Sequence, residues 1–155
     1  PAHVTKHSSC GVIVPGVDTI AVSLANCCRP IPGDPIIGYI SKGQGVKVHR
    51  ADCPNIVNEK KRLIPVQWEE GLDEKQYEVN LIIHSDDRNY LLSDIVTTLQ
   101  QCNVYLKHVD SAVDDGNLEA TTKLTVSVKN AAHLQNLISN LKKVRSVNEV
   151  IRTIQ

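Results

Sequence analysis

The fold of the first half of this chain is decided by two short stretches, Cys27-Cys28-Arg29-Pro30-Ile31-Pro32-Gly33-Asp34 and His49-Arg50-Ala51-Asp52-Cys53. Three thiols and one imidazole are the donor set of a closed tetrahedral zinc site. Neighbouring cysteines can bind one ion together only from a bent loop, and the Pro and Gly residues that follow favour such a loop. His49 and Cys53 are four residues apart, so one helical turn would place both on the same face. We therefore expect zinc to be held by Cys27, Cys28, His49 and Cys53.

Other interpretations of these four residues stay open. Cysteine is often buried as a small apolar side chain, and adjacent cysteines are not a usual zinc-finger spacing. Cys27 and Cys28 could form a vicinal disulfide or act as a redox switch, for which Arg29 is the only obvious electropositive neighbour. The five cysteines are an odd number and no secretory leader is recognisable, so a disulfide framework is not expected.

The composition indicates a water-soluble chain of one domain or two small ones. It has 155 residues, of which 41% are hydrophobic. No stretch approaches the roughly 20 apolar residues that a membrane span needs, so we expect a cytoplasmic protein without membrane contact. The chain contains no Met. This indicates a piece of a longer protein and favours a regulatory or binding function.

The net charge of zero conceals an asymmetry along the chain. Through Trp68 there are eight Lys and Arg residues against four Asp and Glu, whereas from Glu69 onward there are nine against thirteen. A basic first half favours contact with a polyanion, although an ordinary solvated surface would give the same count. The candidate residues for contact with such a polyanion, as phosphate neutralisers, are Arg29, Lys42, Lys47, Arg50, Lys60, Lys61 and Arg62.

The sequence predicts two modules joined by a polar linker at residues 69–76. In the first module, residues 1–68, short strands are expected at Val12–Val14, Ile36–Ile40 and Val46–Val48. A short helix at Ala51–Ile56 and a closing strand at Leu63–Trp68 complete it. So small a module is marginal unless a metal or another staple supports it.

The second module, residues 77–155, has a clearer periodicity. Strands are expected at 77–83 and 118–128, where apolar and polar residues alternate, and also at 104–113 and 147–154. Apolar residues with helical spacing begin at Leu91 and again at Leu134, which predicts two helices. Asp87 or Asn89 is available to cap the first helix, and Asn130 the second. The order βαββαβ predicts an α+β, ferredoxin-like fold with its helices on one face of the sheet.

The first module resembles the conserved-cysteine module, also called the zinc-finger or ribosome-intersubunit domain, of the long RelA/SpoT (Rel) proteins. These proteins make and hydrolyse the alarmone (p)ppGpp. In that family an ACT domain follows, and ACT domains are βαββαβ. The resemblance rests on residues 22–34, Gly38-Tyr39-Ile40, Gly43-Gln44-Gly45-Val46 and residues 48–54.

The resemblance implies a non-catalytic regulatory region, with synthetase and hydrolase domains upstream. It implies contact with ribosomal RNA during the stringent response, control of alarmone synthesis, and weak self-association through the ACT domain. Cys27, Cys28, His49 and Cys53 match the family's four positions one for one, which implies either a zinc site or a hydrogen-bonded cluster that no longer holds zinc. The alternative is an ACT module that senses a branched-chain amino acid without binding RNA.

The ACT loop departs from the family pattern D-R-x-G-L-L, because Tyr90 stands where Gly is usual. Glycine there allows a positive φ and a close approach of ligand to backbone, and tyrosine permits neither cheaply. Amino-acid binding is therefore doubtful, and its candidate residues are Asp87, Arg88, Asn89, Tyr90 and Leu91.

Overall fold

The computed structural model describes residues 10–16, 21–41, 43, 45–59, 62–71, 75–116 and 118–153. The chain divides into two compact units, the first ending at Glu74 and the second running from Lys75 to Thr153. Each unit has its own sheet and its own apolar core. Among the described residues, no helix has the length and apolarity needed to cross a lipid bilayer.

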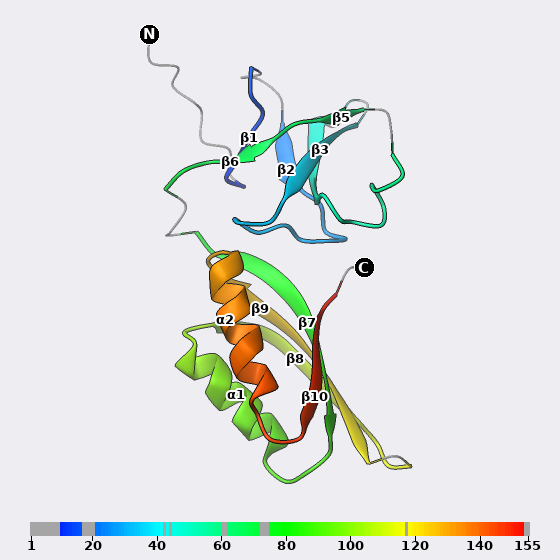
Figure 1. The fold of residues 1–155 in the computed structure, drawn as a ribbon, viewed down its shortest axis with the longest axis vertical. Helices are drawn as coiled ribbons and strands as arrows, with labels where there is room; N and C mark the ends of the chain where they lie inside the picture. Colours follow the sequence, from blue (N-terminus) through cyan, green and yellow to red (C-terminus); the bar gives the residue numbers. More distant parts are fainter. Residues whose placement is uncertain are drawn as a thin grey trace. The chain divides into compact units, whose positions relative to one another are not determined.

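The first unit is built from short strands (Figure 1). They are β1 (Val12–Ile13), β2 (Val22–Leu24), β3 (Ile36–Ser41), β4 (Gly45–Arg50), β5 (Leu63–Ile64) and β6 (Gln67–Trp68). Four of them form a sheet in the order β2-β4-β3-β5, while β1 pairs with β6. The β2–β4 pair is parallel and the other pairs are antiparallel.

Three details of the first unit differ from the sequence-based expectation. Residues 51–58 form consecutive turns, so the short helix predicted at Ala51–Ile56 is wrong. The closing strand predicted at Leu63–Trp68 is two strands, β5 and β6, interrupted at Pro65, which has no N–H to donate to a ladder. The strand β2 was not predicted, since three residues are too few for an alternation to stand out.

A glycine fixes the place where β4 begins. Gly45 has φ 82°, and a Cβ added there would collide with the carbonyl group of Ala21. The next residue, Val46, donates its N–H to that same carbonyl at 2.8 Å. The parallel β2–β4 pairing begins at this close approach, and β2 then leads into the turn that contains Cys27.

The register divides the side chains of the sheet between two faces. On one face, Val46 and Val48 form a buried cluster with Val12 and Val14. On the other face, Cys28 and Cys53 are buried with Ala25 and Ile56, and His49 belongs to this face by its pairing with Ile37. The first unit therefore has two small cores, and one of them contains thiols.

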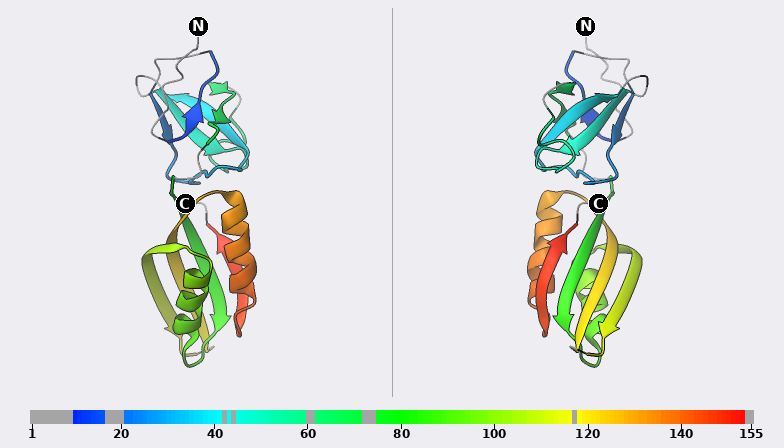
Figure 2. Two further views of the ribbon diagram at one scale, coloured as in Figure 1. Left: turned by 90° about the vertical axis from the view of Figure 1, so that its left-hand side faces the viewer. Right: turned by 90° about the vertical axis from the view of Figure 1, so that its right-hand side faces the viewer.

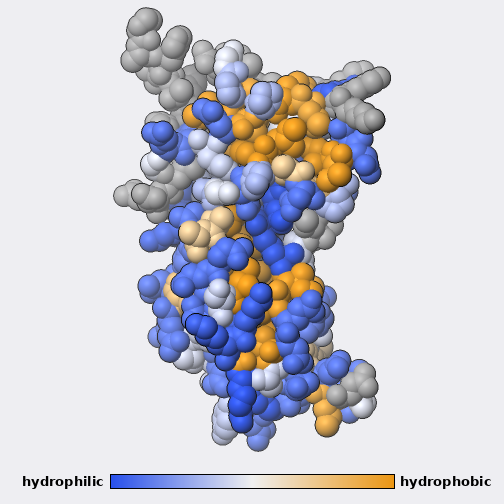
Figure 3. Space-filling model, in the orientation of Figure 1, coloured by the Kyte–Doolittle hydropathy of each residue, from blue (hydrophilic) through white to orange (hydrophobic). Residues whose placement is uncertain are grey.

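The core of the first unit is incompletely covered. Around the valine cluster, eight apolar side chains are only partly buried, among them Ile36, Ile40 and Ile64. Figure 3 shows a broad apolar area on the visible face of this unit. Apolar burial alone therefore contributes little to the stability of this unit, as expected for so small a domain.

The second unit is a four-stranded antiparallel sheet with two helices on one face (Figures 1 and 2). Its elements are β7 (Tyr77–Asp86), α1 (Leu91–Gln101), β8 (Tyr105–Asp114), β9 (Glu119–Val128), α2 (Ala131–Lys142) and β10 (Val147–Arg152). The sheet order is β10-β7-β9-β8. The predicted ferredoxin-like βαββαβ fold is confirmed.

The two helices of this unit begin in different ways. The side chain of Asn130 accepts the N–H of His133 at 2.9 Å, so the predicted cap of α2 is confirmed. The predicted cap of α1 is wrong. Tyr90, rather than Asp87 or Asn89, is the N-cap residue, and no side chain caps this helix. Tyr90 has φ 63°, so tyrosine adopts here the left-handed conformation that glycine adopts most easily.

Candidate functional site

Two turns and the end of a strand bring the three cysteines and the histidine together. Cys27 and Cys28 lie in the turn that follows β2, and Ala25 just before them donates its N–H to the carbonyl of Val48. His49 lies in β4 itself, and Cys53 lies in the turn after it, held by the bond from its N–H to the carbonyl of Arg50. The helical turn expected to align His49 with Cys53 is therefore absent from these described residues. A strand end and a turn do this instead.

The donor atoms are arranged as a tetrahedral metal site requires. The four donor atoms all lie within 4.8 Å of one another. The Cys27 Sγ atom is 3.9 Å from that of Cys28 and 3.7 Å from that of Cys53. Zinc–sulfur bonds of about 2.3 Å at tetrahedral angles would place two sulfurs about 3.8 Å apart. The His49 Nδ1 atom is 3.4 Å from the Cys27 sulfur and 3.8 Å from the Cys28 sulfur, and zinc would require about 3.6 Å.

The electrostatics of the cluster also suit a cation. Burial raises the pKa of Cys28 to about 12 and likewise raises the pKa of Cys53. Burial acts in the same direction on Cys27, but hydrogen bonds from Asn55, Cys53 and Cys28 outweigh it and lower the pKa of Cys27. Three thiolates cannot share this space without a compensating positive charge. A zinc ion held by these residues would supply that charge and would displace the thiol protons.

The imidazole and the surroundings complete this fit. Burial and the nearby Lys47 ammonium lower the pKa of His49, which keeps the ring neutral and able to bind a metal. The backbone N–H of Arg50 donates to the Cys28 sulfur at 3.3 Å, a bond that orients the sulfur and stabilises its negative charge. The residues present therefore fit zinc, and zinc binding itself stays a prediction.

The described candidates for RNA contact differ in their surroundings. Lys47 lies on the same sheet face as His49 and pairs in register with Tyr39. Arg50 is engaged in a salt bridge with Asp52 at 2.8 Å, and its side chain is only 15% exposed. Arg29 and Arg62 both have positive φ angles, of 44° and 65°. Lys42, Lys60 and Lys61 lie outside the described residues.

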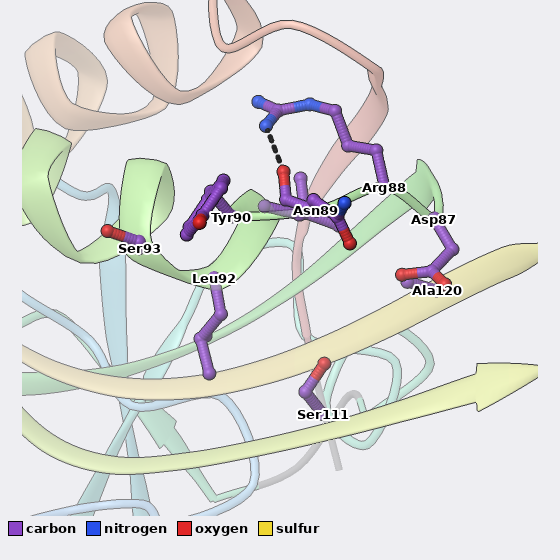
Figure 4. Close-up of a pocket in the computed structure, with 9 residues that line it drawn as sticks. Asp87, Arg88, Asn89, Tyr90, Leu92, Ser93, Ser111 and Ala120 are labelled. Carbon is purple, nitrogen blue, oxygen red and sulfur yellow. Dashed lines mark hydrogen bonds between the residues drawn. The ribbon is translucent and has the colours of Figure 1, made fainter.

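The second unit contains a cavity of about 340 Å³ at the start of α1. All five candidate amino-acid-binding residues line it: Asp87, Arg88, Asn89, Tyr90 and Leu91. Figure 4 shows the Leu92 side chain pointing from α1 toward the strands, while Ser111 points up from β8. The uncapped first turn of α1 also borders the cavity, and such a turn offers backbone N–H groups to an anion.

Arg88 ties the loop that forms this cavity to the rest of its unit. Its guanidinium donates to the carbonyl of Arg145 at 3.1 and 3.0 Å. It also donates to the carbonyl of Asn89 at 3.0 Å, the bond drawn in Figure 4. It also pairs with Asp94 at 2.7 Å. These contacts use the guanidinium within the fold, so Arg88 holds the cavity in shape and is poorly placed to bind a ligand carboxylate.

Several lining residues were not predicted from the sequence. Leu92, Ser93, Ser111 and Ala120 also line the cavity, and Asn55 hydrogen-bonds to Cys27 in the cluster of three cysteines and His49. The alternation of β9 placed Ala120 on the helix-facing side of the sheet, which was a usable signal. Nothing in the local sequence marks Ser111 or Asn55, because their roles depend on strand pairing and loop closure.

Family models match both units. Residues 12–69 match the RelA/SpoT RIS domain, and residues 73–152 match the ACT domain. The chain belongs to the ACT domain family. Together, its RIS and ACT domains are the regulatory domains of RelA/SpoT-type proteins.

Curated relatives match nearly the whole chain. A GTP pyrophosphokinase of Haemophilus influenzae is 35% identical over 151 residues, which are 95% of this chain and 20% of the relative. A bifunctional (p)ppGpp synthase/hydrolase, RelA, of Mycobacterium tuberculosis is 33% identical over 145 residues, 92% of this chain and 19% of the relative. The chain thus spans about a fifth of the length of these relatives.

Among solved structures, the ACT domain from the GTP pyrophosphokinase of Chlorobium tepidum is similar to part of this chain. It is 24% identical, with a TM-score of 0.45, and the match covers 50% of this chain and 99% of that one.

Proposed function

We propose that this chain is a non-catalytic regulatory region of a bifunctional (p)ppGpp synthetase/hydrolase. Its RIS domain contacts ribosomal RNA, and the region controls alarmone synthesis by catalytic domains upstream in the same cytoplasmic protein. The observation that carries this proposal is the succession of a RIS and an ACT domain in one chain, together with relatives named GTP pyrophosphokinase. The curated relatives extend far beyond the part that this chain matches, which leaves room for catalytic domains.

RNA contact is supported by cationic side chains on the RIS domain. Lys47 projects from a rigid strand, and among the described residues no acidic side chain pairs with its ammonium. Arg62 is exposed at the start of β5. Neutralising phosphates with such residues supplies affinity and orientation, whereas sequence is read mainly through the bases. We therefore expect binding that responds strongly to salt and weakly to sequence.

The test is the affinity of the whole chain for ribosomes at several salt concentrations. Contact with about four phosphates predicts a slope of log K against log salt of about −3 to −4. The matched control is a variant in which Lys123 of the ACT domain, an exposed lysine in β9, is replaced by Ala. That variant should keep the slope. An affinity that does not change with salt would contradict the proposal.

The metal cluster has a structural role in this proposal. A zinc ion bound by Cys27, Cys28, His49 and Cys53 would join the turn after β2 to the turn after β4, and it leaves no open position for catalysis. Metal analysis of the chain purified without chelators should find one zinc per chain. A folded chain without metal would leave a hydrogen-bonded thiol cluster in its place.

A second candidate function is amino-acid sensing, and the cavity at the start of α1 favours it. Its volume of about 340 Å³ is sufficient for a small amino acid. Calorimetry with valine and isoleucine separates the two candidates. Heat that saturates with valine would support the sensor, and its absence would support a region that acts through RNA contact alone.

Weak self-association through the ACT domain is part of the leading proposal. The strand β8 lies at the edge of the sheet, and its Tyr105 and Val113 side chains are 65% and 46% exposed. An uncovered edge with a few apolar side chains suits a transient contact better than an obligate interface. Light scattering over a concentration series should detect a monomer–dimer balance that valine leaves unchanged.

A further inference from the structure

Cys27 lies close to the other three donor residues of the cluster and is also the cysteine of the cluster that solvent reaches. Its Sγ atom lies 3.4 Å from the His49 Nδ1 atom, 3.7 Å from the Cys53 sulfur and 3.9 Å from the Cys28 sulfur. It is also the only partly exposed thiol of the three, since Cys28 is 1% and Cys53 is 0% exposed. A soluble oxidant therefore reaches the cluster through Cys27.

We propose that peroxides, acting as two-electron oxidants, oxidise Cys27, and that the oxidised Cys27 then forms a disulfide with Cys53. The formation of this bond depends only on the thiol geometry. The accompanying loss of metal rests on the zinc site proposed above.

The chemistry balances with hydrogen peroxide as the oxidant. The Cys27 sulfur takes one peroxide oxygen and becomes a sulfenic acid, the O–O bond breaks, and the other oxygen leaves as water with the thiol proton. The Cys53 sulfur then attacks the Cys27 sulfur, so that an S–S bond forms and the S–O bond breaks. The leaving hydroxyl takes the Cys53 proton as a second water. Where zinc holds the sulfurs, solvent supplies the two protons and the zinc ion loses two ligands.

The geometry selects Cys53 over Cys28 as the partner. Adjacent residues have their Cα atoms about 3.8 Å apart, and disulfides normally require about 4.4–6.8 Å. A Cys27–Cys28 bond would therefore strain the backbone of the turn, whereas Cys53 comes from a different loop. The Cys27 and Cys53 sulfurs, now 3.7 Å apart, need to approach by ~1.7 Å to reach the S–S bond length.

The consequence is a module whose metal site depends on the redox state. A zinc ion that keeps only Cys28 and His49 has lost half of its donor set, and its affinity falls accordingly. The disulfide would still link the turn after β2 to the turn after β4, but in a different geometry. Because the valine core of this unit is small, the changed geometry of the two turns lowers the stability of the whole RIS domain.

The experiment exposes the full chain, purified with its metal, to hydrogen peroxide and follows two signals together. A colorimetric zinc chelator measures released metal, and mass spectrometry maps the thiols after blocking. Tryptic cleavage at Lys42, Lys47 and Arg50 separates the peptide of Cys53 from that of Cys27 and Cys28. Fragmentation between Cys27 and Cys28 then identifies the linked sulfur.

We expect a Cys27–Cys53 link, release of one zinc for each link, and reversal by dithiothreitol with added zinc. Cys10 and Cys102 should stay available to the blocking reagent, and Cys10→Ser should release zinc at the unchanged rate. Cys53→Ser lacks the attacking sulfur, so a sulfenic acid should persist on Cys27 even where the variant has lost the metal and unfolded, and a 1,3-dione probe should trap it. The mapping of the native chain does not depend on whether that variant folds.

A different pair of linked sulfurs, or full retention of free thiols and zinc under peroxide, would overturn the proposal. A chain that contains no zinc but forms the Cys27–Cys53 bond would remove the zinc site from the proposed function and leave the oxidation site in place. A chain that binds zinc and resists peroxide would overturn the oxidation site and leave the zinc site of the proposed function in place.

Discussion

The two units of this chain are stabilised in different ways. In the ACT domain, large apolar side chains such as Leu81, Leu124, Leu134 and Leu137 are at most 2% exposed. In the RIS domain, one described core cluster consists of four buried valines, and the other contains the sulfurs of Cys28 and Cys53. The ACT domain can therefore depend on apolar burial, whereas the RIS domain needs an additional constraint.

The difference also bears on where function is located. The ACT cavity lies at the end of a well-packed sheet, where loop residues can vary without loss of the core. In the RIS domain, the strand β4 contributes His49 to the candidate metal site, Val46 and Val48 to the small core, and the cations Lys47 and Arg50. We therefore expect a change in the cluster to affect both stability and the proposed RNA contact.

The largest expected effect is that of metal removal. Structural zinc contributes on the order of 10 kcal/mol to small domains at neutral pH, so a strong chelator should unfold the RIS domain and leave the ACT domain folded. Trp68 is the only Trp, lies in the RIS domain and donates its Nε1–H to the Asp34 carbonyl at 3.0 Å. Its fluorescence therefore reports on this domain alone.

Two variants make this measurement specific. Cys53→Ser should lose the metal and unfold the RIS domain, whereas Cys10→Ser, which changes a thiol outside the cluster, should keep the metal. If the metal-free chain shows the same Trp68 transition as the chain with metal, apolar burial is sufficient in both units and the contrast between them disappears.

The next effect concerns the ACT core. Leu137 in α2 is 0% exposed, and Leu137→Ala should destabilise the ACT domain by about 2–5 kcal/mol because it removes apolar contacts and leaves a cavity. Urea unfolding followed by far-UV circular dichroism, in which both helices contribute, measures this change. The Trp68 signal and its response to chelator should stay as in the native chain. A coupled loss of both signals would mean that the units do not unfold independently.

The sequence predicted the strongly periodic parts of this fold. The spacing of apolar residues predicted β7, β9 and both helices, because each of these elements buries one face in the core. The cluster of Cys27, Cys28, His49 and Cys53 follows from residue chemistry, although the predicted helical turn is wrong. The three-residue strand β2 and the start of β4 depend on the contact between Gly45 and Ala21, which are distant in sequence. No local pattern encodes such a contact.

A smaller effect separates two cations of β4. Lys47→Ala should flatten the salt dependence of ribosome binding by about one unit of slope, since one phosphate contact is lost. Arg50→Ala should flatten it less, because the Arg50 guanidinium is already paired with Asp52 at 2.8 Å. The same salt titration measures both variants. An equal loss in both would mean that Arg50 exchanges Asp52 for phosphate, and no loss in either would remove β4 from the RNA-binding surface.

The smallest effect concerns Tyr90, where the ACT loop departs from its usual glycine. Its side chain is 80% exposed, so the ring contributes little packing, while its φ of 63° is unfavourable for any residue with a Cβ. Tyr90→Gly relieves that strain but gains freedom in the unfolded chain, which leaves a net stabilisation of about 1 kcal/mol or less. Tyr90→Ala is the matched control, since it removes the ring and keeps the Cβ.

Thermal unfolding of the ACT domain should therefore rank Tyr90→Gly above Tyr90→Ala, and calorimetry with valine tests the cavity in both. We expect no valine heat from the native chain and binding by Tyr90→Gly, because only glycine lets a ligand approach the backbone at the start of α1. Binding by Tyr90→Ala as well would identify the ring as the obstacle rather than the Cβ. Saturable binding by the native chain would mean that a strained tyrosine is compatible with the ligand site, and the sensor function would then take precedence over RNA contact as the role of this domain.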